Sequence, residues 1–99
     1  MNVASSIAQS GLNASQRRMG SSAHNIANVE TDNFRREEVT QAAVAEGGVK
    51  ANTRRADVPG EALAKDLVEQ KSAGYAFDAN LKVIQTEKQM MGKLLDEQA

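Results

Sequence analysis

A heptad pattern of apolar residues in the C-terminal part of the chain constrains its fold more than any other feature. Steps of four and three residues from Leu63 reach an almost unbroken series of positions: Leu67, Gln70, Gly74, Phe77, Leu81, Ile84, Lys88, Met91 and Leu95. This spacing places the residues on one face of a helix and is typical of a coiled-coil seam. A helix over residues 61–97 would be about 55 Å long at roughly 1.5 Å per residue. A rod of that length cannot bury its apolar face within so short a chain, so the pattern predicts that other chains cover part of it.

A lighter stripe of apolar residues occupies the N-terminal part, residues 3–29. Leu12, Met19 and Ile26 are seven residues apart and mark its centre. Ser and Ala are frequent in this segment, and Gly11 and Gly20 lie within it, each costing on the order of 1 kcal/mol of helix propensity relative to Ala. We therefore expect a helix that forms fully only when it is packed. Asn28, or a residue just after it, is the expected stop, because Asn tolerates the left-handed conformation that ends helices.

The periodicity is lost between these stripes, over residues 30–60. Residues 34–45 and 49–55 flank Glu46-Gly47-Gly48, and the second arm alternates in polarity, which indicates either a short β-hairpin or a flexible loop. Asp57 is the candidate N-cap of the C-terminal helix, with Pro59 in its first turn. The sequence therefore predicts a single, mainly α domain with three parts: an N-terminal helix over 1–29, a connector over 30–60 and a C-terminal helix over 61–99.

Composition excludes several classes of function. The chain has no cysteine, so disulfides, thiolate metal sites and thiol nucleophiles are all excluded. Its net charge of −1 offers no global field for nucleic acid. No apolar stretch reaches the length that a membrane span needs. The N-terminus lacks the basic and apolar regions of a cleavable secretory signal, so export would follow another route.

No residue pattern points to catalysis, a cofactor or a metal. His24 is the only histidine and has no partner at metal-ligand or acid–base spacing. The serines lack a nucleophile-elbow motif, and the Gly47-Gly48 pair is too short for a phosphate loop. The six arginines form three adjacent pairs at 17–18, 35–36 and 54–55, which we interpret as solvated or intersubunit ion-pairing residues. We predict no catalytic, cofactor-binding or metal-binding residue.

Segments at both ends of the chain form a recognisable set of motifs. Residues 10–19 read SGLNASQRRM and residues 24–31 read HNIANVET; residues 66–70, 75–86 and 90–95 read DLVEQ, YAFDANLKVIQT and MMGKLL. In this order they resemble the N- and C-terminal signatures of the bacterial flagellar rod and hook axial proteins. His24 replaces the first Asn of the usual Asn-Asn-Ile-Ala-Asn motif, and a following proline is missing. The central β domain common in that family is reduced to the short connector, as in the short proximal rod proteins.

The resemblance implies a fold and a function. The two helices are expected to pair as an antiparallel α-helical coiled coil, joined by a loop or short β-hairpin. Many copies, together with neighbouring rod proteins, would stack into the axial tube that transmits torque across the periplasm. Export is expected through the flagellar type III apparatus without a cleaved signal peptide. The alternative is a small helical adaptor or assembly factor that binds axial proteins. Neither reading involves an enzyme, a nucleic acid or a membrane span.

Two groups of residues are expected to carry this function. Three asparagines are assigned to capping or register: Asn25, Asn28 and Asn80. The packing and assembly residues are the apolar members of the two stripes: Leu12, Met19, Ile26, Leu67, Phe77, Leu81, Ile84, Met91 and Leu95. Because the C-terminal stripe is wider than a two-stranded seam requires, we expect one edge to contact the N-terminal helix and the rest to contact neighbouring subunits.

Overall fold

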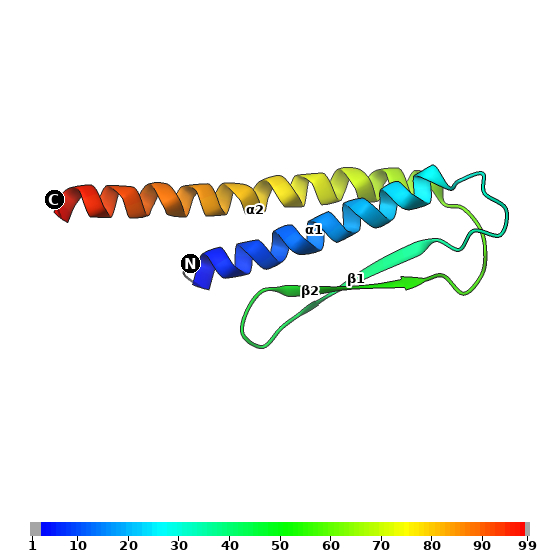
Figure 1. Ribbon diagram of the computed structural model, residues 1–99, viewed down its shortest axis with the longest axis horizontal. Helices are drawn as coiled ribbons and strands as arrows, with labels where there is room; N and C mark the ends of the chain where they lie inside the picture. Colours follow the sequence, from blue (N-terminus) through cyan, green and yellow to red (C-terminus); the bar gives the residue numbers. More distant parts are fainter. Residues whose placement is uncertain (1–2, 99) are drawn as a thin grey trace.

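A computed structural model of the chain describes residues 3–98 as two helices packed against each other, with a small antiparallel hairpin between them in sequence (Figure 1). The elements are helix α1 (Val3–Ala27), strand β1 (Glu37–Ala43), strand β2 (Val49–Arg55) and helix α2 (Leu63–Gln98). The helices run in opposite directions, and α1 lies between α2 and the hairpin. The molecule measures 63 × 25 × 13 Å. The prediction of a mainly helical chain is confirmed, and the connector is a hairpin.

Helix α1 ends at Ala27, where the sequence predicts a stop. The backbone N–H of Asn28 donates to the carbonyl of His24 at 3.1 Å, and the Asn28 side-chain amide donates to the same oxygen at 2.9 Å. The side chain thus adds a second hydrogen bond to a carbonyl of the last helical turn. The left-handed conformation expected near Asn28 occurs instead at Asn33, where φ is 61°. The position of the stop is correct, but its mechanism is a side-chain hydrogen bond.

The start of α2 differs from the prediction, and the assignment of Asp57 as its N-cap is wrong. The helix begins at Leu63, whose N–H donates to the carboxylate of Glu61 at 2.9 Å. The carbonyl of Ala62 accepts the first helical hydrogen bond, from the N–H of Asp66, at 2.9 Å. The segment between Asp57 and Leu63 is held by a tertiary contact, since the Gly60 N–H donates to the carbonyl of Phe34 at 3.2 Å. That bond keeps the chain out of the helix, so α2 starts later than local propensity suggests.

The hairpin pairs β1 with β2 in a regular register that runs from Glu37 opposite Arg55 to Ala43 opposite Val49. At its tip Gly47 and Gly48 have φ values of 94° and 92°, a region that residues with a Cβ rarely adopt. The tip is attached to α1, because Val49 N–H donates to Ser10 Oγ at 3.1 Å. The hairpin therefore lies along one side of α1 and leaves the opposite side for α2.

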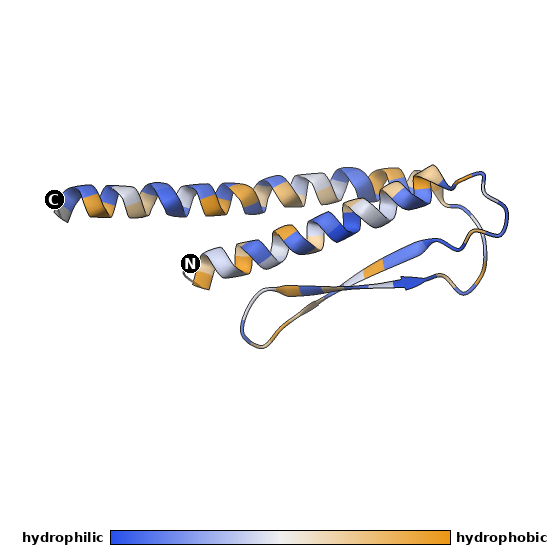
Figure 2. Cartoon of the chain, viewed as in Figure 1, coloured by the Kyte–Doolittle hydropathy of each residue, from blue (hydrophilic) through white to orange (hydrophobic). Residues whose placement is uncertain are grey.

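Helix α2 is longer than α1 and extends past its start (Figure 1). Near the first turn of α1, Ser5 Oγ donates to the carboxylate of Glu87 on α2. Residues 88–98 of α2, which we call the overhang, continue beyond this contact without α1 beside them. Apolar residues recur along the whole of α2, including the overhang (Figure 2). Within residues 3–98, the fold thus leaves the apolar residues of the overhang without cover from α1 or the hairpin.

The two glycines of α1 provide a test of the helix pairing. A Cβ on Gly11 would lie 2.6 Å from the side-chain amide of Asn80 on α2, whereas a Cβ on Gly20 would meet nothing within 4 Å. We predict that Gly20→Ala stabilises the chain by up to about 1 kcal/mol, and that Gly11→Ala gives no such gain. In an Asn80→Ala background, Gly11→Ala should stabilise as Gly20→Ala does. Urea unfolding followed by circular dichroism measures all three effects, and an equal gain from both glycines with Asn80 present would contradict the packing.

Candidate functional site

A buried polar cluster joins the end of α1, the start of β1 and the start of α2. It consists of Asn25, Arg36, Glu37 and Asp66, and we call it the clamp. The side-chain amide of Asn25 donates to the carbonyl of Glu37 at 2.9 Å, and its oxygen accepts the N–H of Glu37 at 2.8 Å. The same amide donates to Asp66 Oδ1 at 3.2 Å. One side chain on α1 therefore pairs with the backbone of the hairpin and also reaches α2.

Arg36 completes the clamp from the loop before β1. Its guanidinium binds Asp66 through both carboxylate oxygens, with Nε 3.0 Å from Oδ2 and Nη2 on Oδ1. The side chain of Arg36 is 13% exposed and that of Asp66 is 4% exposed. This bidentate geometry is the strongest form of arginine–carboxylate pairing. Asp66 also lies in the first turn of α2, where the helix dipole favours a negative charge.

The pairing changes the acidity of Arg36. Its hydrogen bond to Asp66 raises the pKa of the guanidinium above its ordinary value, assisted by the charges of Asp66, Glu38 and Glu61 and opposed by burial. Since the folded pKa lies above the unfolded one, this contribution to stability is fully present below the unfolded pKa and is lost only as pH rises through the folded pKa. The arginine therefore keeps its charge at every pH at which the protein would be handled.

Further polar contacts extend from the clamp along the interface between the helices. Ser22 Oγ donates to Gln70 Oε1, and Arg18 binds Glu69 through Nε and Ser72 through Nη2. Every buried side-chain nitrogen and oxygen among the described residues has a hydrogen-bond partner. A groove of about 280 Å³ runs beside these groups and is lined mainly by polar and charged side chains. These groups bind one another, so the groove is best explained as the surface of a structural cluster.

The remaining chemistry of this end of the molecule is also structural. The ring of His24 packs edge-on against Phe34, with centroids 5.3 Å apart, and its Nε2 is 4.0 Å from a Glu37 oxygen. The guanidinium of Arg55 lies over the ring of Phe34, 5.7 Å from the ring centre. Within residues 3–98, no three His, Asp or Glu side chains are grouped so that they could hold a metal ion. In the same range, no helix is long and apolar enough to cross a membrane.

Small and polar residues form most of the interface between the helices. On α1 the buried or half-buried positions repeat at three and four residues: Ser5, Ala8, Leu12, Ser15, Met19, Ser22 and Asn25. Their counterparts on α2 follow the same spacing: Asp66, Gln70, Ala73, Phe77, Asn80, Ile84 and Glu87. Leu12, Met19, Phe77 and Ile84 are the large apolar members of these two rows. Few of the large apolar side chains are therefore buried between the two helices of the same chain.

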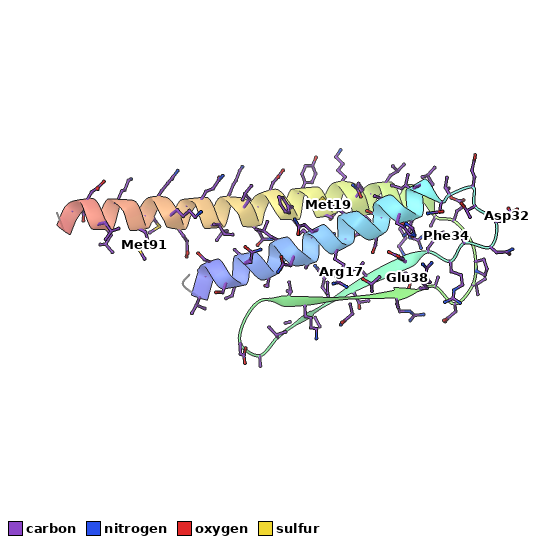
Figure 3. All side chains as sticks on the ribbon, viewed as in Figure 1. Arg17, Met19, Asp32, Phe34, Glu38 and Met91 are labelled. Atoms are coloured by element: carbon purple, nitrogen blue, oxygen red, sulfur yellow. The ribbon has the colours of Figure 1, made fainter. Side chains whose placement is uncertain are left out.

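The structure divides the residues predicted for packing into two sets. Leu12 is buried, Met19 lies between the helices (Figure 3), and Ile26, Phe77 and Ile84 are half-buried. The other four are exposed, with exposed fractions between 38% and 65%: Leu67, Leu81, Met91 and Leu95. Leu67 and Leu81 lie one position away from the row that meets α1, whereas Met91 and Leu95 lie beyond the part of α2 that α1 covers. These four side chains are therefore placed for contacts outside the chain.

The three predicted asparagines have different surroundings. Asn25 links three elements in the clamp, and Asn28 binds a carbonyl in the last turn of α1. Asn80 donates to the carbonyl of Ala76 on its own helix at 2.9 Å, and its side chain lies against Gly11 of α1. Arg36 and Asp66 were not predicted, and Arg36 was interpreted only as a solvated or intersubunit residue. The signal available for Asp66 is an acidic residue directly beside the apolar stripe, in the first turn of the long helix.

Removing one partner of the buried pair tests the clamp. We predict that Asp66→Asn destabilises the folded chain by about 3–5 kcal/mol, because it leaves the charge of Arg36 buried without its counter-ion. Asp57→Asn is the matched control, since Asp57 pairs with Arg54 at 3.4 Å on the surface with 90% of its side chain exposed. The control should leave the urea midpoint unchanged. Similar midpoints for the two variants would show that the clamp does not hold the fold.

Comparison with protein-family models gives no match for this chain, and comparison with curated proteins gives none either. Function is therefore inferred from the chain's own residues. Two features carry it: a polar clamp that fixes the helices and hairpin together, and an apolar surface on α2 that the chain leaves exposed.

Proposed function

We propose that this chain is a structural subunit of the bacterial flagellar basal-body rod, which self-assembles by helix packing into the axial tube. The observation that carries the proposal is the distribution of polar and apolar residues around α2. Most of its residues that face α1 are polar or small, with Phe77 and Ile84 as the large apolar members, whereas many large apolar residues remain exposed on the other sides. A helix with apolar residues on several sides is suited to burial among neighbouring helices. The terminal motifs at residues 10–31 and 66–95 supply the flagellar part of the proposal.

Two of the exposed leucines of α2 lie in one heptad row, with a glycine between them. Leu67, Gly74 and Leu81 are seven residues apart on α2, and we call this row the outer flank. Leu67 and Leu81 are exposed, and a Cβ on Gly74 would meet nothing within 4 Å. A glycine between two leucines permits the close approach of another helix. Burial of each leucine would contribute about 1.5–3 kcal/mol to an assembled contact.

The helix pair itself is proposed to act as an antiparallel coiled coil. The three- and four-residue spacing of the facing positions on both helices supports this geometry. In the assembly, the clamp would keep the two helices in register while the outer flanks of neighbouring copies pack together. Neighbouring rod proteins and the type III export apparatus are the proposed partners, and the periplasmic part of the basal body is the proposed location.

Replacement of Leu81 tests assembly through the outer flank. We predict that Leu81→Asp raises the concentration needed for assembly at least about tenfold, since a charge cannot be buried there without a partner. Leu81→Met retains an apolar side chain of similar volume and should assemble as the parent does. Light scattering against concentration measures assembly, and circular dichroism confirms that both variants keep their helices.

Two results would contradict the proposal. If Leu81→Asp assembles at the parent's concentration, the outer flank is not the contact. If the parent stays monomeric at every concentration, alone and with other rod proteins, the chain is not a tube subunit. A complex of fixed stoichiometry with an axial protein, without polymerisation, would instead support the adaptor alternative.

A further inference from the structure

Each strand of the hairpin has an outer edge that its own partner strand does not use. At one end of the ladder the N–H of Ala56 donates to the carbonyl of Arg36, and at the other end the N–H of Val44 donates to the carbonyl of Gly48. Hydrogen-bonded pairs alternate with non-bonded pairs along an antiparallel ladder. The even-numbered residues therefore bond across the hairpin, and the odd-numbered residues of both strands point their N–H and C=O groups outward.

Helix α1 bonds only to the ends of these two edges. The side chain of Asn25 pairs with the outward N–H and C=O of Glu37, and Ser10 Oγ accepts the outward N–H of Val49. Within residues 3–98, the outward backbone groups between these ends make no hydrogen bond: Val39, Gln41 and Ala43 on β1, and Ala51 and Thr53 on β2. Neither strand contains a proline or a bulge that would protect its edge. Such edges are templates for a further strand.

The charges of the two strands select the strand that can be added. Strand β1 carries Glu37 and Glu38 and no basic residue, whereas β2 carries Lys50, Arg54 and Arg55 and no acidic residue. Addition of β1 to β1 would give the acids no counter-ion, and addition of β2 to β2 would bring basic residues together. Side chains stand roughly perpendicular to a sheet, so Glu38 can face an arginine across either edge. The complementary pair is therefore β1 of one copy with β2 of another.

The free stretches of the two edges also match in register. If β2 of a second copy pairs with β1 in the register of the hairpin itself, Val39 lies opposite Thr53 and Gln41 lies opposite Ala51 of the added strand. All of these residues point their backbone groups outward, so they can bond to each other. The same register places Glu38 opposite an arginine at position 54. A groove of about 280 Å³ borders β1 at Val39, so there is space beside this end of the edge.

The spacing of a sheet agrees with the packing of the helices. Strands β1 and β2 cross when the molecule is viewed down its shortest axis, so one lies in front of the other at the crossing and their edges point along that axis (Figure 1). A copy added at an edge is displaced by two strand spacings, roughly 9.6 Å. In this direction α2, α1 and the hairpin are each a single layer. The repeat would place α1 beside α1 and α2 beside α2 within the roughly 8–10 Å of packed helices.

We propose that the outer edge of β1 is a self-association site whose occupant is the outer edge of β2 from a second copy of this chain, added antiparallel in the register of the hairpin. The contact is heterologous, so it repeats from copy to copy and builds a ring or a filament. Sheet twist adds a rotation at each step. The inference rests on the proposed self-assembly and adds a second contact to it, on the side of α1 away from α2.

Disulfide trapping tests both the occupant and its register. The chain has no cysteine, so Thr40→Cys and Asn52→Cys can be made as separate variants at two exposed positions. In the added sheet these positions of neighbouring copies are directly opposite, with Cα atoms about 4.5 Å apart. Two copies of position 40 are roughly 9.6 Å apart, beyond the roughly 7 Å that a disulfide spans. An equimolar mixture under a thiol–disulfide buffer should give several-fold more mixed dimer than either same-position dimer.

Controls separate this contact from random collision and from other edge pairings. A mixture of Thr40→Cys with Lys71→Cys gives the collision background, because Lys71 is exposed on α2. A mixed dimer of the Thr40 and Asn52 variants no more abundant than this background would overturn the proposal. A dominant dimer of the Thr40 variant with itself would also overturn it, since it would indicate that β1 pairs with β1.

A proline on the outer edge of β1 provides a second readout. The N–H of Gln41 points outward, so Gln41→Pro removes a donor of the edge and keeps the hydrogen bonds of the hairpin. It should raise the concentration needed for assembly at least about tenfold in light scattering. Gln41→Thr keeps the N–H and suits a strand, so it should assemble as the parent does. Hydrogen exchange at Thr40, whose N–H bonds within the hairpin, checks that both variants keep the hairpin.

The outcomes distinguish this contact from the rest of the proposed function. If Gln41→Pro assembles at the parent's concentration and the mixed dimer stays at background, the hairpin contact is wrong and assembly through the outer flank stands. If the parent stays monomeric at every concentration, alone and with other rod proteins, both proposals are wrong.

Discussion

A buried carboxylate is the constraint on which the rest of this structure depends. Asp66 is 3% exposed, and such a charge is tolerated only with a counter-ion and a full set of hydrogen bonds. Arg36 and Asn25 supply both, from the loop before β1 and from α1. Meeting this requirement fixes the start of α2 against the end of α1 and the first residue of the hairpin. One ionic group thereby sets the relative position of three elements in a chain with a small apolar core.

The polar character of the helix interface has a consequence for the surface. Because serines, alanines and the groups around Gln70 and Glu87 occupy the space between the helices, the leucines and methionines of α2 remain outside. A polar interface with specific hydrogen bonds selects one register of the two helices. Apolar surfaces associate through a non-directional effect, so they need no single geometry. The chain can therefore adopt a defined shape alone and still retain apolar surface for other chains. This is the property that the proposed rod subunit would need.

Sequence reasoning located the elements well, since each depends on local chemistry. The bounds of β2 and the stop after Ala27 follow from turn glycines and a capping asparagine. The predicted row includes Phe77 and Ile84, which do face α1, but it also includes Leu67 and Leu81, whose places in the contact are taken by Asp66 and Asn80. The contacts that decide between these positions join residues 30 and 41 positions apart. No periodicity in one helix contains that information.

Residue-resolved amide hydrogen exchange of α2 tests the central claim, that polar contacts fold the chain and its apolar surface is kept for other chains. In dilute solution we predict strong protection over residues 63–80, where α2 packs on α1, and little over residues 88–98. Raising the protein concentration should protect the overhang while leaving the first segment unchanged. Uniform protection along α2 at every concentration would contradict the account, because it would mean that the helix is stable without the partners that its exposed apolar residues require.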